Sequence, residues 1–399
     1  MTGPGLPPLP PLVRLTRLHV SMVAGEAIMA VALADSMFLS ISPTDARPKV
    51  ILFLLLSFLP FTVVARYIGP VVETFRGGQR AVLFGVALMR AVLMIGMVTS
   101  IKSLALFPLA FGALVLSKTY SISKSATVPQ VVSGDEALVQ ANSRLARAAG
   151  VVGFLVGVPA YLVQMVSTTF ALYVGAAVFL SGAYQAWRLP PEREHVTVDR
   201  ELAETELHSR DVVRAAVTMR VLRGVSGFMF FLLAFWLRGE TAGTAWFGLA
   251  IAIGNMATLA ANWTAPSVRA RMSTDAMLTA SVAAVAVAGV AAGISGLFVA
   301  GILLTAFVNA AAAFGRVAFE ATVQSGAPDA DRTSAFARFE TQNQLAWVGG
   351  GLVPVVLNLD GHAGSWFVGA VALAALGLRL RGGFRSPGGR ATGRGRPAR

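Results

Sequence analysis

Long apolar stretches separated by short polar ones make up most of this chain. A helix needs about 20 apolar residues to cross about 30 Å of hydrocarbon, and twelve stretches come close to that length. We therefore predict an all-α membrane protein with twelve transmembrane helices. Their expected positions are 18–41, 49–72, 81–100, 103–123, 143–164, 168–188, 213–237, 243–264, 276–293, 296–318, 342–358 and 364–380.

The longest polar stretch divides these helices into six and six. Its charges are mixed, as is typical of a linker between two membrane bundles. The predicted segments are a disordered cytoplasmic lead-in (1–17), an N-terminal six-helix bundle (18–188), a cytoplasmic linker (189–212), a C-terminal six-helix bundle (213–380) and a basic disordered cytoplasmic tail (381–399).

The two halves repeat at an offset of about 195 residues. Ala-Thr-Val at 126–128 returns at 321–323, and Val-Pro at 158–159 returns at 353–354. Each match is short, but both share one offset. The pattern indicates two pseudo-repeated bundles.

Composition supports the membrane class. The 399 residues are 55% apolar and 13% charged, with a mean hydropathy of +0.67, whereas soluble domains carry about 25% charged residues. These values exclude a soluble enzyme, a disordered tail protein and a secreted disulfide scaffold. The absence of cysteine excludes disulfides and thiolate metal sites. The histidines show no metal-ligand spacing and are expected in solvated helix ends or loops: His19, His195, His208 and His362.

The basic residues predict the orientation, since cytoplasmic loops are enriched in Lys and Arg. With the N-terminus inside, only Arg47, Lys49, Lys102 and Arg238 fall on the outer side. Both ends are therefore expected in the cytoplasm. Lysine is rare among the 33 basic residues, which is typical of high-GC bacteria and favours a bacterial cytoplasmic (inner) membrane. The arginines from 379 onward indicate contact with anionic lipid rather than with nucleic acid.

Ionisable residues fall inside the first four predicted helices. Each Asp, Lys or Arg at the membrane centre costs about 2.5–3.5 kcal/mol, so these residues must be paired, hydrated or functional. In one interpretation an acid exchanges protons and a neighbouring cation tunes its proton affinity. In the other, a static salt-bridge network orders the first half. The residues are Glu26, Asp35, Arg66, Arg90 and Lys118.

The second half shows neutral polar stripes instead. We expect its acids near helix ends or in loops, so the groups that couple transport to protons are expected in the first half. We expect the stripes to line the substrate cavity; the alternative is hydrogen bonding between helices, worth about 0.6 kcal/mol each. One stripe is Asn255, Thr258 and Asn262, and the other is Thr305, Asn309 and Arg316.

The segment 69–80 reads Gly-Pro-Val-Val-Glu-Thr-Phe-Arg-Gly-Gly-Gln-Arg. It resembles the loop between the second and third helices of the major facilitator superfamily: a glycine, an acid four residues on, then glycine and basic residues. The resemblance covers about residues 14–380. It implies two six-helix bundles around a central site and a loop that latches them in the outward-facing state. The implied gating residues are Gly69, Glu73, Arg76, Gly77 and Arg80.

Residues 129–142, between the fourth and fifth predicted helices, resemble the drug and siderophore exporter branch. The fifth helix carries Gly153, Gly157 and Pro159, similar to that branch's antiporter motif except that one residue separates the last glycine from the proline. Small residues that allow close helix packing are the alternative. The superfamily often has a basic residue linked to proton transfer where Lys118 falls.

Together these features predict a secondary transporter that works by alternating access, with proton-coupled efflux of a small amphiphilic compound such as a drug or natural product. Its expected partners are the substrate, protons and the bilayer; it is expected to be a monomer without a cofactor. The glycines at 349–351 lack a P-loop lysine, so neither ATP hydrolysis nor another enzyme activity is expected. An importer, uniporter or lipid flippase remains open, as does a non-transporting receptor or assembly factor on a transporter scaffold.

Overall fold

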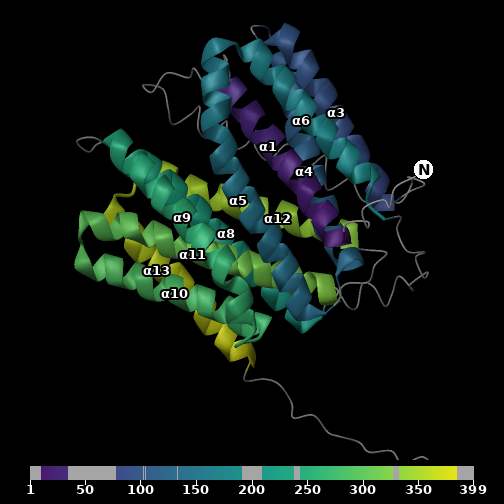
Figure 1. Ribbon diagram of the computed structural model, residues 1–399. Coiled ribbons are helices and arrows are strands. Elements are labelled where there is room, and N and C mark those ends of the chain that lie inside the picture. The colour runs from purple at the N-terminus through teal and green to yellow at the C-terminus, as the bar shows by residue number, and fades with distance from the viewer. Residues whose placement is uncertain are drawn as a thin grey trace, which may run out of the picture.

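The computed structural model describes residues 10–34, 78–190, 209–237, 243–326 and 332–383, except 102, 104 and 133. Every regular element in these ranges is a helix (Figure 1). The helices are α1 (Pro11–Ala34), α3 (Gly78–Ser100), α4 (Leu106–Val131), α5 (Asp135–Val166), α6 (Thr168–Trp187), α8 (Arg210–Trp236), α9 (Gly243–Arg269), α10 (Thr274–Ser295), α11 (Phe298–Gly326), α12 (Arg332–Leu357) and α13 (Gly361–Gly383).

Within the described residues, nine helices are long and apolar enough to cross a membrane. The other two, α4 and α12, carry more polar residues. The all-α membrane fold predicted from the apolar stretches is confirmed. The predicted helix at 49–72 lies outside the described residues.

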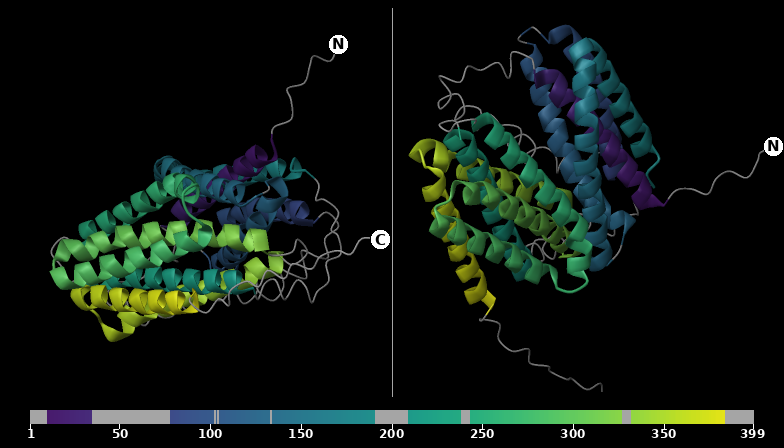
Figure 2. Two further views of the ribbon diagram at one scale, coloured as in Figure 1. Left: turned by 90° about the horizontal axis from the view of Figure 1, so that it is seen from below. Right: turned by 60° about the vertical axis from the view of Figure 1, so that its left-hand side comes forward.

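The helices form two bundles, α1 and α3–α6 in one and α8–α13 in the other (Figures 1 and 2). In the first bundle α6 packs against α1 and α3; in the second α8 packs against α12, and α10 against α13. Glycine permits the closest of these contacts. A Cβ on Gly350 would overlap the carbonyl oxygen of Gly224, and one on Gly227 would overlap that of Trp347. Gly350 and Gly351 of α12 therefore serve packing against α8, whereas a Cβ at Gly349 would meet no atom within 4 Å in the described part of the chain.

The bundles meet near one end, where α1 and α8 begin (Figure 1). One apolar cluster spans both bundles, and its members from the second bundle include Met219, Ala265, Val317 and Phe336. All of these lie within ten residues of a helix terminus at that end. We call it the closed end and the opposite end the far end. The far half of α5 is strongly exposed, with Phe154 at 76% and Val166 at 87%.

Several helix boundaries differ from the predicted ones. Helix α1 begins at Pro11 rather than at 18, because proline at the first helical position loses no intrahelical hydrogen bond. Helix α12 begins at Arg332, ten residues before the predicted apolar run. Helix α13 reaches Gly383, so Arg379 is not part of a basic tail. It is buried, forms a 2.6 Å ion pair with Asp275 and joins α13 to α10.

Candidate functional site

An ion pair lies inside the first bundle, at the middle of α1. Glu26 and Arg90 lie 3.4 Å apart, and the Arg90 side chain is fully buried whereas that of Glu26 is 41% exposed. Ser117 on α4 donates a 2.5 Å hydrogen bond to the same Glu26 oxygen. The Arg90 guanidinium also stacks 4.4 Å from the centroid of the Phe179 ring. A buried cation thus gains both a carboxylate and an aromatic face.

His19 lies closer to the closed end of the same helix. It is buried, and its Nδ1 lies 2.9 Å from the Tyr120 hydroxyl. The prediction that all four histidines are solvated is wrong for His19, because α1 begins earlier than expected and places this ring inside the bundle.

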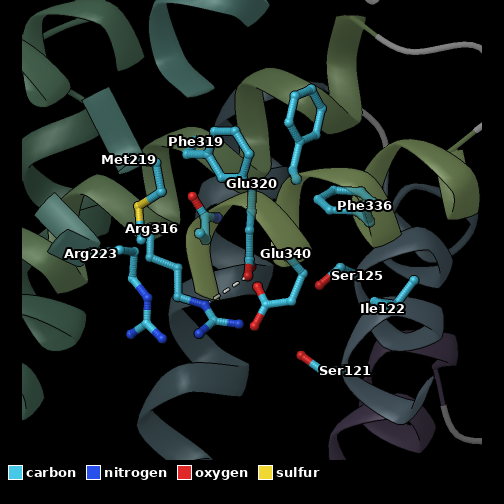
Figure 3. Close-up of a pocket in the computed structure, with 12 residues that line it drawn as sticks. Ser121, Ile122, Ser125, Met219, Arg223, Arg316, Phe319, Glu320, Phe336 and Glu340 are labelled. Carbon is cyan, nitrogen blue, oxygen red and sulfur yellow. Dashed lines mark hydrogen bonds and ion pairs between the residues drawn. The ribbon is translucent and has the colours of Figure 1, made fainter. Parts of the chain in front are cut away.

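A pocket lies between the two bundles, closer to the closed end (Figure 3). Helix α4 of the first bundle supplies one wall, and α8, α11 and α12 of the second supply the others. Arg316 donates a 2.9 Å hydrogen bond to Glu320 within α11, and the Glu340 carboxylate lies beside this pair (Figure 3). The lining residues are Ser121, Ile122, Ser125, Met219, Arg223, Arg316, Phe319, Glu320, Phe336, Phe339, Glu340 and Asn343.

Charged residues of the second bundle line this pocket, and two lysines of the first bundle lie within electrostatic range of one of them. Glu340 is within electrostatic range of Arg316 and Arg223 of its own bundle and of Lys118 and Lys124 of the other. Lys118 is in turn within electrostatic range of Glu26. The Glu26–Arg90 pair and the pocket carboxylate Glu340 therefore both influence Lys118 electrostatically.

The closed end carries polar contacts between the bundles. Asn142 on α5 donates a 2.7 Å hydrogen bond to Gln324 on α11, and Gln324 donates a 2.8 Å bond to the Ser125 carbonyl on α4. Both amide side chains are buried. Arg147 on α5 stacks 5.1 Å from the Trp263 ring of α9. These contacts hold the bundles together where the pocket ends.

Of the ionisable residues predicted in the first half, Glu26, Arg90 and Lys118 come together as described. Asp35 and Arg66 lie outside the described residues, as do Gly69, Glu73, Arg76 and Gly77 of the predicted gating loop. Arg80, the last residue of that loop segment, lies in α3 with its guanidinium 5.0 Å from the Trp187 ring.

The glycines of α5 differ from the packing interpretation. A Cβ at Gly153 or Gly157 would meet no atom within 4 Å in the described part of the chain, and Pro159 follows in the same exposed half of the helix. Close contact occurs at Gly150, where a Cβ would overlap the Leu259 side chain of α9. The reason is that α5 and α9 converge only toward the closed end.

Most residues of the two predicted cavity stripes do not line the pocket. Among their six residues only Arg316 lines the pocket. Asn262 and Thr305 are buried, and the Asn309 amide donates to the Thr305 carbonyl of its own helix. Thr258 likewise bonds back to Gly254, whereas Asn255 is exposed. A polar side chain is sheltered from lipid either between packed helices or in a cavity. Most of the stripe residues lie where α9 packs against α11.

Sequence reasoning missed the acids and the second cation of the pocket. Glu340 lay before the predicted helix at 342–358, and Glu320 lay just beyond the one at 296–318. Arg223 fell inside a predicted helix but was not considered. Extending the helices through their polar termini, as the structure does, would have placed Glu320 and Glu340 within helices.

Comparison with known proteins identifies relatives of this chain. No protein-family model matches it. An uncharacterized protein of Mycobacterium leprae is 30% identical over 414 aligned residues, which cover 92% of this chain and 70% of that protein. The chain belongs to the family of this mycobacterial protein. Since that relative is itself uncharacterized, membership of the family does not indicate an activity.

Solved structures show which fold this chain has. FucP, a major facilitator superfamily transporter in the outward conformation, superposes with a TM-score of 0.69 at 11% identity, covering 94% of this chain and 99% of FucP. A bacterial homologue of the iron transporter ferroportin, in an outward-facing state, gives 0.67 at 16% identity, covering 94% and 100%. The chain has the major facilitator fold, and it is an integral membrane protein with multiple spans.

Proposed function

We propose that the chain is a secondary transporter that works by alternating access and exports a small amphiphilic compound in exchange for protons. One observation carries this proposal: ionisable groups of the second bundle line a pocket at the bundle interface, within electrostatic range of two lysines on α4 of the first bundle. Rocking of one bundle against the other separates α4 from α8, α11 and α12. The charge contacts across the pocket must then be remade in each transport cycle, which links conformation to what the pocket binds.

The closed end is assigned to the cytoplasmic side of a bacterial cytoplasmic membrane. This assignment follows from the excess of Lys and Arg in the loops at that side. It makes the structure an outward-facing state, in keeping with the conformations of FucP and the ferroportin homologue. Gly153 and Gly157 lie on the same face of α5 as Gly150. They would meet α9 when the far end closes.

Glu26 is the proposed proton carrier. Its side chain is half-exposed, whereas the partner cation Arg90 is fully buried. Protonation of Glu26 weakens its attraction for Arg90 and for Lys118. Because Lys118 also interacts with Glu340 of the other bundle, a proton on Glu26 changes the balance of charge across the interface.

Export of an amphiphile is supported by two features. Apolar and aromatic side chains form much of the pocket wall, including Met219, Phe319 and Phe336. The segment 129–142 resembles the drug and siderophore exporter branch. A dense clamp of basic residues, as a sugar phosphate would require, is not found among the described pocket residues.

Inside-out vesicles test the proposal, since uptake into them corresponds to export. Two fluorescent or radiolabelled probes are offered with and without an imposed proton gradient: 1-naphthoate, an amphiphilic anion, and ethidium, an amphiphilic cation. We expect gradient-driven accumulation of at least one probe, and loss of that accumulation in Glu26→Gln. Glu136→Gln is the matched control, because Glu136 is exposed at the closed end of α5.

Other outcomes select other functions. Flux that ignores the gradient indicates a uniporter, and accumulation only in right-side-out vesicles indicates an importer. Full gradient-driven accumulation in Glu26→Gln contradicts coupling at this residue. Absence of flux for both probes contradicts the exporter proposal and favours a non-transporting role.

A further inference from the structure

The pocket between the bundles is lined by two cations, Arg223 and Arg316, and two carboxylates, Glu320 and Glu340, and two lysines of α4 add positive charge near it. Arg316 is neutralised by Glu320 at 2.9 Å. Glu340 is the other lining carboxylate, and it is within electrostatic range of Arg223 in the lining and of Lys118 and Lys124 outside it. Glu26 is within range of Lys118, but its own close partner is Arg90. In the described part of the chain, the cations of this region outnumber its carboxylates.

Arg223 is the pocket cation with the fewest protein partners. It lies in the middle of α8, lines the pocket and is half-buried. Its guanidinium has no hydrogen bond and no ion pair within 4 Å to another described residue, and its nearest electrostatic partners are Glu340 and Arg316. In Figure 3 the Arg223 and Arg316 side chains extend in the same direction into the pocket. Two guanidinium groups that repel each other are stabilised when an anion lies between them.

The chemistry of guanidinium determines which anions fit. Its planar N–H groups match the two oxygens of a carboxylate and bind them with two parallel hydrogen bonds. An ammonium compound would instead face the excess of cations and be repelled. Electrostatics at this site therefore favours an organic anion over an organic cation.

The aromatic wall determines what the anionic group is attached to. Phe319 and Phe339 pack edge to face with ring centroids 5.5 Å apart, and Phe336 lines the same pocket. Aromatic faces and edges bind apolar and aromatic bodies. The pocket thus pairs a cationic side with an aromatic side.

We propose that this pocket binds the anionic group of an amphiphilic organic acid, with Arg223 as the principal ligand and the aromatic wall against the apolar body. The inference rests on the proposed function in one respect, since it takes the pocket between the bundles to be the substrate site. It specifies the charge of the substrate, which the proposed function leaves open.

Equilibrium binding to the purified full-length protein in detergent tests this inference without any transport. Three probes share one naphthalene body: 1-naphthoate, 1-naphthylmethylammonium and 1-naphthalenemethanol. We expect 1-naphthoate to bind at least tenfold more tightly than the cation and more tightly than the alcohol. Arg223→Gln should weaken 1-naphthoate binding at least tenfold and leave binding of the alcohol within threefold.

Arg338→Gln is the matched control. It removes the same charge from α12 two residues from Glu340, but Arg338 is exposed and does not line the pocket. Its affinity for 1-naphthoate should stay within twofold of the unmodified protein. If Arg223→Gln fails to fold, Arg223→Lys replaces it, because lysine keeps the charge but loses the bidentate fork. We expect Arg223→Lys to weaken binding three- to tenfold.

Equal affinity for the anion and the cation overturns the inference, as does unchanged 1-naphthoate affinity in the Arg223 variant. Binding of none of the three probes also overturns it. Arg223-dependent binding of 1-naphthoate together with absence of proton-driven flux in vesicles supports the anion site and refutes the proposed transport function. The two proposals can therefore fail separately.

Discussion

Gln324→Leu is predicted to shift the protein away from the conformation described. Gln324 is buried between the bundles, and its two short hydrogen bonds are at 2.7 Å with Asn142 and at 2.8 Å with the Ser125 carbonyl. A hydrogen bond between neutral groups contributes about 1 kcal/mol net. Both bonds cross from one bundle to the other, so both are lost when the closed end opens.

The expected magnitude follows from this count. Removing both bonds weakens the closed arrangement by about 2 kcal/mol, which is about 30-fold in the conformational equilibrium. In the opposite conformation water reaches these groups, so the substitution costs little there. A protein that favours the conformation described by about 30 to 1 would therefore populate both states almost equally.

Distance measurements between spin labels provide the assay. The chain contains no cysteine, so introduced cysteines are labelled without background. Arg17 on α1 and Arg271 after α9 are exposed near the closed end of opposite bundles, and Val166 and Ile294 are exposed near the far end. Gln324→Leu should lengthen the Arg17–Arg271 label distance and shorten the Val166–Ile294 distance in the same fraction of molecules.

Gln185→Leu is the control, because Gln185 lies on α6, which packs within the first bundle. It should leave both distance distributions unchanged. The reasoning is refuted if Gln324→Leu also leaves both unchanged, or if both distances lengthen together, which would indicate loosening rather than rocking.

Three stability predictions can be checked by thermal unfolding in detergent. Gly350→Ala should destabilise the protein by about 1–3 kcal/mol, since its Cβ would overlap a carbonyl oxygen of α8. Gly349→Ala should be neutral or slightly stabilising, since its Cβ would meet no atom within 4 Å in the described part of the chain. Equal effects of the two substitutions would contradict this packing. Arg379→Leu should cost about 2–4 kcal/mol because it removes a buried cation's bonds to two other helices, α8 and α10. Asp275→Asn should cost under about 1 kcal/mol, since that carboxylate is half-exposed, and a larger loss than for Arg379→Leu would refute this ranking. Arg90→Leu removes an ion pair at 3.4 Å and an aromatic contact at 4.4 Å. It should cost less than about 3 kcal/mol, because the leucine fills the buried site while the Glu26 carboxylate keeps access to water. A cost above that of Arg379→Leu would count against this account.

The sequence alone determined that the chain is a helical membrane protein, because an apolar run of sufficient length must be a helix in lipid. It also indicated that Glu26 and Arg90 lie within membrane helices, since both fall inside apolar runs. In both cases the property depends on position along a single helix.

Helix ends were harder to predict, because apolar content does not mark them. Helix α12 extends ten residues through Arg332–Thr341 before its apolar run. In this extension Phe336 is buried, Glu340 is partly buried and Arg338 is exposed. That extension places Glu340 in the pocket, and no apolar pattern could have indicated it.

The tertiary structure alone decided which face each polar residue presents. Thr305, Asn309 and Arg316 share a helical stripe, but the first two serve packing against α9 and the third lines the pocket. Likewise Gly150 contacts α9 whereas Gly153 and Gly157 do not, because two helices that cross touch over only part of their length. The lipid environment requires that a polar group be sheltered. The neighbouring helices determine whether it is sheltered by helix packing or in the pocket.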